Sequence, residues 1–485
     1  MKKPLTTLFL LIALASQTFS CGGTDQPSDT TDSSAPEDTT AAPATMLDSL
    51  EDADYNGYEF NIFGVLQTVG GDYFYRDEQT GDVIEDAVFK RNRAVEERYS
   101  VDLSFSLTDD FNESVKTIRT YIESGDDTYD LLTSPHLSLG PLIVSRYFVD
   151  WKEIPSVDLS LDCYIDAANS VYSIGDSMPL LFGDFMETNT LRCWNFVFNK
   201  RLAEENSLGD IYSAVDEGKW TIDYFNNLIK DISKDLDGNT VMDENDFYGF
   251  STDRLATLDA FSRPCGIFAV TKNSENLPEL SFMNDNTVKA FEAVYNLYYN
   301  CPGTFSTKEN VWHIENMFAE SKSVFAAIRM DFMMNEKVRA MKDDYGVLPY
   351  PKLTEEQEYT TYLSGTYSAQ MIPVTQPSGD YERTGIITQA LNAYGHEYVI
   401  PEIFETTLKT KLTRDEDSVR MLKLITDSRA YSFDSCDELN FPLSPISTFR
   451  NLLGSKKSDI ASYYAKNVDK AQAWITSMVT AWENS

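Results

Sequence analysis

Histidine is scarce in this 485-residue chain, which contains only His136, His313 and His396. None of them stands in a His-Glu-x-x-His pattern, which supplies two zinc ligands and a general base from one helix. The chain also lacks a Gly-x-Ser-x-Gly nucleophile turn and a Gly-x-x-x-x-Gly-Lys phosphate loop. These absences argue against zinc proteases, serine hydrolases and P-loop nucleotidases, and we expect neither catalysis nor an organic cofactor.

Basic side chains are also in short supply. Lys and Arg total 40 against 77 Asp and Glu, which gives a formal net charge of −37. A nucleic-acid-binding protein needs a basic patch to neutralise phosphates, so the balance argues against that class of partner. The same charge disfavours anionic ligands, whereas a neutral ligand meets no Coulombic penalty on approach.

Long apolar runs are missing as well. Residues 8–15 form an apolar run about half the length of the roughly 20 residues that a membrane-spanning helix needs. No later apolar run without charged residues is longer. Because the run follows the basic residues Lys2 and Lys3, it is typical of an export signal. We therefore expect an exported protein that is not an integral membrane protein.

A cysteine follows this signal. The position of Cys21 resembles the lipobox of bacterial lipoproteins, whose cysteine is diacylated, although Thr18 and Phe19 depart from the usual Leu and small residue. We expect residues 1–21 to be a lipoprotein signal ending at a lipidated Cys21, on the extracellular face of the cytoplasmic membrane; ordinary cleavage nearby is the alternative. Residues 22–53 are rich in Ser, Thr and Asp, and we expect a disordered tether.

The other cysteines are odd in number and form no Cys-x-x-Cys pair. They are Cys163, Cys193, Cys265, Cys301 and Cys436. We expect small buried apolar side chains, with a single disulfide as the alternative.

Strand and helix patterns alternate at the start of the folded part. The strand patterns lie at residues 58–63, 101–107 and 129–133, and the helix patterns at residues 83–99 and 113–124. This order predicts a parallel sheet covered by helices. Ligands of such sheets gather beyond the carboxyl ends of the strands, here after Phe63 and Thr133.

A set of short segments, taken in order, resembles the extracellular solute-binding proteins (family 1 type) of bacterial ATP-binding-cassette (ABC) carbohydrate importers. The segments are Phe148-Val149-Asp150-Trp151, residues 195–202 with the turn Asn199-Lys200, Gly218-Lys219-Trp220-Thr221, residues 318–325, Tyr345-Gly346-Val347-Leu348-Pro349 and Arg414-Asp415-Glu416.

The resemblance implies an α/β, two-lobe periplasmic-binding-protein-like fold (type II) with a hinge and an interlobe ligand cleft. We expect lobe 1 to comprise residues 54–185 plus 322–358, and lobe 2 residues 186–321 plus 359–485. A monomer of this kind captures a sugar or oligosaccharide and delivers it to ABC permease subunits, with the lipid anchor as its only membrane contact. Two alternatives stay open: a cell-surface glycoside hydrolase, whose two carboxylates would be hidden among 77 acids, and a binding lipoprotein that feeds a sensor.

One segment predicts a helix start. Thr221 suits the N-cap, Asp223 suits the positive end of the helix, and Trp220 suits a hydrophobic contact with Phe225. We favour this structural role of Trp220 over ligand stacking.

The helix leads into a stretch that matches a calcium loop. Oxygen ligands stand at Asp235, Asp237, Asn239, Asp243 and Asp246, with the backbone of Val241 at the carbonyl position. Thr240 replaces the usual glycine at the sharp turn, and Asp246 replaces the longer bidentate Glu. The loop predicts one weak structural calcium ion, and an acidic exposed turn is the alternative.

Ligand contacts are expected on loops that follow strands. The candidate stacking rings are Tyr73, Tyr75, Trp312 and Tyr367, and the candidate hydrogen-bonding groups are His136, Arg329 and Asp331. For Trp151 and Trp194, core and cleft positions remain equal alternatives.

Overall fold

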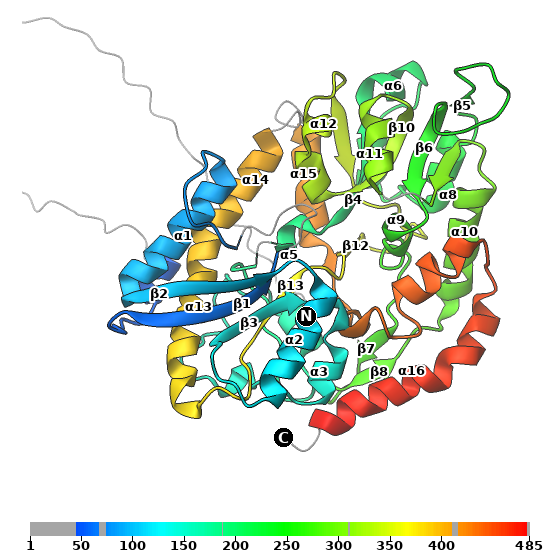
Figure 1. Cartoon of the computed structure of the whole chain (residues 1–485). Helices are drawn as coiled ribbons and strands as arrows, with labels where there is room; N and C mark the ends of the chain where they lie inside the picture. Colours follow the sequence, from blue (N-terminus) through cyan, green and yellow to red (C-terminus); the bar gives the residue numbers. More distant parts are fainter. Residues whose placement is uncertain (1–44, 67–73, 187, 309–310, 410–415, 483–485) are drawn as a thin grey trace, which may run out of the picture. The chain divides into compact units, whose positions relative to one another are not determined.

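Figure 1 shows the chain as a computed structural model. The structure describes residues 45–485 except 67–73, 187, 309–310, 410–415 and 483–485, and residues 45–485 form one unit. The expected lipoprotein signal with Cys21, and the first part of the expected tether, lie outside the described residues. No described helix is both long and apolar enough to span a bilayer.

The last part of the expected tether is folded. The short 3-10 helix η1 (Met46–Ser49) is followed by Leu50, which is buried. Arg98 donates hydrogen bonds to the carbonyls of Leu47 and Leu50, at 3.1 and 2.8 Å. The prediction of disorder was wrong for residues 45–53, because their few apolar side chains pack against the folded part.

The first sheet has the strand order β13-β3-β1-β2. Strand β1 (Tyr58–Val65) pairs in parallel with β2 (Val101–Thr108) and β3 (Leu131–Pro135), while β13 (Ser368–Met371) runs antiparallel to β3. The connecting helices are α1 (Val83–Tyr99) and α2 (Phe111–Glu123). The predicted parallel β-α-β-α-β unit is confirmed.

The second sheet has the order β11-β4-β10-β6-β5, with β9 paired to β6. The strands are β4 (Trp194–Asn199), β5 (Ser233–Lys234), β6 (Phe247–Asp253), β9 (Thr304–Thr307), β10 (Ser323–Arg329) and β11 (Tyr345–Leu348). Strands β6, β9 and β10 are mutually parallel, whereas β4 runs antiparallel to β10 and β11. At one edge of this sheet, the carboxyl ends of β6, β9, β10 and β11 therefore lie beside the amino end of β4.

The strand pairing differs from the expected division of the chain. Residues 322–358 supply β10 and β11 to the second sheet, not to the first. Residues 359–485 supply β13 to the first sheet and α13 (Tyr381–Tyr394), which packs against α1. A buried apolar strand does not reveal its partner strand in its own sequence, so the crossing points were misplaced.

Helices and short strands complete the structure. The helices are α3 (Gly140–Val144), α4 (Asp166–Tyr172), α5 (Thr188–Leu191), α6 (Lys200–Glu205), α7 (Ile211–Asp216), α8 (Ile222–Ile229), α9 (Ala256–Asp259), α10 (Asp285–Tyr299), α11 (Val311–Ala319), α12 (Glu336–Arg339), α14 (Ile400–Lys409), α15 (Glu416–Asp427) and α16 (Ile460–Trp482). The short strands pair as β7 (Val270–Lys272) with β8 (Pro278–Leu280) and as β12 (Thr361–Tyr362) with β14 (Arg429–Ala430).

The predicted start of α8 is confirmed. Thr221 caps the helix by accepting a hydrogen bond from the backbone N–H of Tyr224. Trp220 is fully buried, lies 5.3 Å from Phe225 between ring centroids, and donates its indole N–H to the carbonyl of Pro349. The structural role of Trp220 is therefore correct. The five described cysteines are likewise all free and buried, as predicted.

Candidate ligand-binding site

The carboxyl edge of the second sheet brings two predicted residues together. Arg329 ends β10, and its Nε and Nη2 donate to the two carboxylate oxygens of Asp331, at 2.7 and 2.6 Å. Arg192, which precedes β4, donates from Nη1 to the same carboxylate at 2.5 Å. One buried carboxylate thus bridges two guanidinium groups, which leaves Asp331 little capacity to bind a ligand.

A second carboxyl lies beside this bridge. Glu315 of α11 is 2% exposed, and burial together with the nearby Asp331 raises its pKa to about 8. Its Oε2 accepts a hydrogen bond from Asn335, whereas Oε1 has no partner among the described residues. Glu315 is therefore protonated at neutral pH. Neither Glu315 nor Arg192 was predicted, because their sequence surroundings resemble those of any helix or loop.

Trp194 belongs to the same edge. Its ring is 1% exposed, and the guanidinium carbon of Arg329 lies 5.9 Å from the ring centroid. Trp151 is equally buried and donates its indole N–H to the carbonyl of Gln370. Of the two alternatives left open for these tryptophans, the structure favours the core.

The carboxyl end of β3 joins His136 to Tyr367. The Nδ1 of His136 lies 3.0 Å from the carbonyl oxygen of Tyr367, and the two rings are 4.0 Å apart between centroids. The hydroxyl of Tyr172 contacts both the Nε2 of His136, at 3.1 Å, and the hydroxyl of Tyr367, at 2.6 Å. Burial lowers the pKa of His136 to about 3, so the ring is neutral and can donate from Nδ1.

This burial corrects the predicted roles of His136 and Tyr367. Their exposed fractions are 0% and 1%, because Phe182 and Tyr431 pack around the Tyr367 ring. A ring enclosed by protein side chains offers no face to a sugar. The sequence predicted their proximity to a strand end but not their enclosure.

The crossover segment at residues 363–367 connects the two strand ends. The backbone N–H of Ser364 donates to the carbonyl of Arg192, and that of Leu137 donates to the carbonyl of Gly365. Cys193 also forms a β-bridge with Leu363. The Arg329 and His136 clusters are therefore attached to opposite ends of one short segment.

The remaining predicted contacts are less well defined. Tyr75 is half-buried, with its ring 4.7 Å from that of Phe105. Tyr73 and the side chain of Trp312 lie outside the described residues. Their predicted stacking roles stay predictions.

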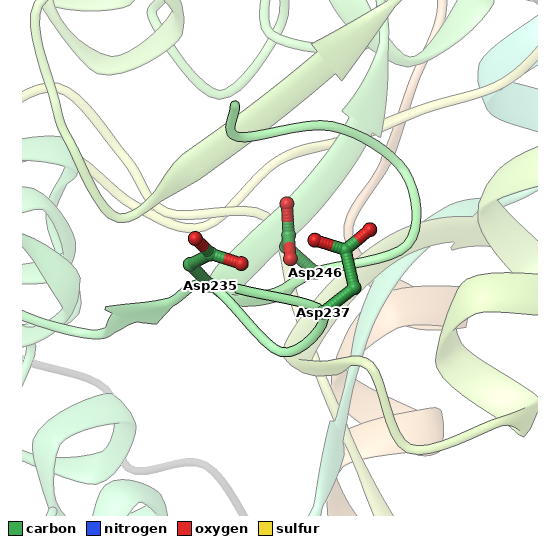
Figure 2. Close-up of side chains that lie close together, drawn as sticks. All are labelled: Asp235, Asp237 and Asp246. Carbon is green, nitrogen blue, oxygen red and sulfur yellow. The ribbon is translucent and has the colours of Figure 1, made fainter. Parts of the chain in front are cut away.

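The predicted calcium loop brings three carboxylates together. Oxygens of Asp235, Asp237 and Asp246 lie within 4.8 Å of one another, and Figure 2 shows the three side chains converging. Asp243 is not part of this cluster, and its Oδ1 accepts the backbone N–H of Asn245. Ligands at the first, third and last positions of a calcium loop thus stand where such a loop requires them.

The backbone of this loop is left-handed at its sixth position. Thr240 has φ of +67°, the left-handed conformation that glycine usually supplies. Asp235 accepts the backbone N–H groups of Gly238 and Thr240, which lower its pKa and keep it ionised. Asp246 is fully buried and accepts the N–H groups of Leu236 and Asp243. Asn239 and Val241 are exposed.

Comparisons with known proteins identify the fold. No protein-family model and no curated protein sequence matches the chain. A cyclo/maltodextrin-binding protein solved with maltotetraose has a TM-score of 0.53 and 13% identity, over 89% of this chain and 98% of that one. The ABC substrate-binding protein Lmo0181 of Listeria monocytogenes was solved with cycloalternan. It has a TM-score of 0.51 and 11% identity, over 88% of this chain and 99% of that one.

A third similar structure is UgpB of Mycobacterium tuberculosis in complex with glycerophosphocholine. Its TM-score is 0.51 at 12% identity, over 87% of this chain and 98% of that one. The likeness therefore extends over nearly the whole length of each protein. The chain has the two-lobe α/β fold of the ABC-transporter solute-binding proteins.

Proposed function

We propose that the protein is a solute-binding protein that captures a sugar or oligosaccharide and delivers it to an ABC importer. The observation that carries the proposal is the match of the fold over 84–89% of this chain and almost all of each similar structure. Two of these similar proteins were solved with oligosaccharide ligands, cycloalternan and maltotetraose. The shared fold is what supports the proposed function.

The same observation disfavours the glycoside hydrolase. Such an enzyme needs two carboxyl groups that flank a bond of the substrate, one acid and one nucleophile or base. Asp331 and Glu315 lie near one another, but Asp331 is bonded to Arg192 and Arg329, and both acids are buried. Asp331 is arranged to hold two arginines in place, and binding without hydrolysis is the expected activity.

The cellular setting belongs to the proposal too. A lipidated Cys21 would hold the protein on the extracellular face of the cytoplasmic membrane, and ABC permease subunits would receive the solute from a monomer. The composition of residues 22–44, rich in Ser, Thr and Asp, supports this setting, because such a composition is typical of a tether between an anchor and a folded domain.

The calcium loop fits a structural ion. Three carboxylates at these distances repel one another, and a divalent cation with oxygen ligands removes the repulsion. Asp235, Asp237 and Asp246 would hold the ion, assisted by the exposed Asn239 and the carbonyl of Val241. Calcium would supply stability to the loop between α8 and β6 and no chemistry.

A binding experiment tests the function. The mature protein is heated with a panel of oligosaccharides, and each compound that shifts the melting temperature is titrated by calorimetry. A ligand present at 100 times its dissociation constant adds about 2.7 kcal/mol of stability. Release of reducing ends from a bound glycan would contradict the proposal, and so would a panel without a single shift.

A further inference from the structure

A polar group outside the predicted site lies at β14 and directly after it. Arg429 opens β14, Tyr431 follows this two-residue strand directly, and the two side chains are close enough to interact electrostatically. Thr361 of β12 pairs with Arg429, and Leu363, just beyond β12, bridges to Cys193. Burial raises the pKa of Cys193 to about 11, with an opposing effect of Arg429. Arg429 and Tyr431 thus lie close to the start of β4.

Both side chains retain unused hydrogen-bond donors. Arg429 donates from Nε to the carbonyl of Thr426 at 2.8 Å, and within the described chain its other N–H groups form no hydrogen bond or ion pair. Tyr431 is 8% exposed, and its buried hydroxyl has no partner among the described residues. An unpaired buried donor lowers stability, so the Tyr431 hydroxyl calls for a partner such as an ordered water or a ligand, whereas the unused nitrogens of the half-buried Arg429 are open to either.

An acid near both residues is already engaged in another hydrogen bond. Asp184 contributes to the electrostatic environment of both Arg429 and Tyr431. Its Oδ2, however, lies 2.7 Å from the Nδ1 of His396, and this hydrogen bond raises the pKa of His396. The Asp184 and His396 side chains are 14% and 36% exposed, and Arg429 itself is half-buried, so this region is not sealed from solvent. Arg429 therefore remains a cation without a bonded counter-ion.

We propose that Arg429 and Tyr431 form a subsite for a carboxylate, and that the solute is a sugar bearing a carboxyl group, such as a uronic-acid oligosaccharide. This inference rests on the proposed function and names its substrate class. The two unused nitrogens of the guanidinium match the two oxygens of a carboxylate, a pairing stronger than a bond to a neutral hydroxyl. The Tyr431 hydroxyl supplies a further donor.

The net charge of the chain does not oppose this subsite. Charges separated by more than about 8 Å are largely screened at physiological ionic strength, so most of the net charge of −37 acts weakly there. A half-buried guanidinium in direct contact with the ligand is screened less than these distant charges. The sequence-based expectation of a neutral ligand considered only the summed charge.

The test compares one ligand in two charge states. Calorimetry of the mature protein measures trigalacturonate and its carboxyl-reduced, neutral counterpart. We expect trigalacturonate to bind more tightly, and Arg429→Gln to weaken it by roughly 10- to 150-fold while changing the neutral ligand little. Arg420→Gln is the matched control, because Arg420 is exposed on α15 and pairs with Asp216 and Asp417. Arg429→Lys keeps the charge and should recover only part of the affinity.

The outcomes separate the two proposals. If neutral oligosaccharides bind as tightly as the acidic one, or Arg429→Gln weakens both equally, the carboxylate subsite is wrong and the solute-binding function stands. If no saccharide of either kind binds, the proposed function fails as well. Melting curves establish that each variant is folded, and Arg429→Lys serves if the Gln variant is not.

Discussion

Buried polar residues decide how this protein responds to pH and mutation. Glu315 has a folded-state pKa of about 8 against an ordinary value of 4.5, because burial disfavours its ionised form. Below pH 4.5 the group is protonated in both states. As pH rises toward 8, the unfolded chain loses this proton while the folded chain keeps it, so stability falls by up to about 1.4 kcal/mol per pH unit.

Glu315→Gln should remove this slope. The amide is neutral at every pH, and its oxygen can still accept the hydrogen bond from Asn335. We expect the free energy of unfolding of the variant, measured by denaturant titration, to depend less on pH than that of the wild type. Glu320→Gln is the control, since Glu320 is 60% exposed. Equal slopes for wild type and Glu315→Gln would show that Glu315 is ionised in the folded protein.

A second residue tests the enclosure of the Tyr367 ring. Among the described residues its hydroxyl bonds only to that of Tyr172, so Tyr367→Phe should cost about 1 kcal/mol of folding stability. Because the ring is buried, the affinity for the bound saccharide should stay unchanged in calorimetry. A loss of affinity without a loss of stability would instead place Tyr367 in the ligand cleft.

At the scale of elements, the calcium loop can be tested without disturbing the fold. Asp237 is exposed and bonds only within the loop, to Asn239. Millimolar calcium should raise the melting temperature of the wild type, because we expect a dissociation constant in the 10⁻⁴–10⁻³ M range of extracellular calcium sites. Asp237→Asn should reduce this increase in melting temperature. An unchanged melting temperature with calcium and with chelator would assign the loop as an acidic turn.

The backbone of the same loop gives an independent prediction. Thr240 has φ of +67° and Gly238 φ of +74°, and an L-residue in this region costs roughly 1–2 kcal/mol relative to glycine. Thr240→Gly should therefore stabilise the protein and tighten calcium binding, whereas Gly238→Ala should destabilise it. A melting temperature that falls in Thr240→Gly would show that the threonine side chain contributes a contact.

The sequence predicted most elements but not their partners. Helix 83–99 and the first three strands are confirmed within two residues, because hydrophobic periodicity is local information. The pairing of β10 with β4 and of β13 with β3 joins residues more than a hundred positions apart, and nothing in either strand specifies the other. His136 and Arg329 were placed at strand ends correctly, but enclosure and ion pairing depend on distant residues such as Tyr172 and Arg192.

For the molecule as a whole, the two sheets share crossover segments. The chain passes from β11 of the second sheet to β13 of the first, and the intervening residues 363–367 bond to Arg192 and Leu137. In a two-lobe binding protein, segments that connect the lobes absorb the backbone changes of closure. A ligand that contacts both lobes binds the closed state more tightly and shifts the population toward it.

We therefore expect ligand to compact the mature protein. In small-angle scattering, the radius of gyration should decrease when the saccharide that gives the largest thermal shift is added at saturation, and a saccharide that gives no shift serves as the control. Arg429→Gln, with its weaker affinity, should require a correspondingly higher ligand concentration for the same decrease. Because closure follows from contacts to both lobes, the decrease and the calorimetric saturation should occur at the same ligand concentration. Saturation by calorimetry without any change in scattering would place the ligand on one lobe, outside the cleft.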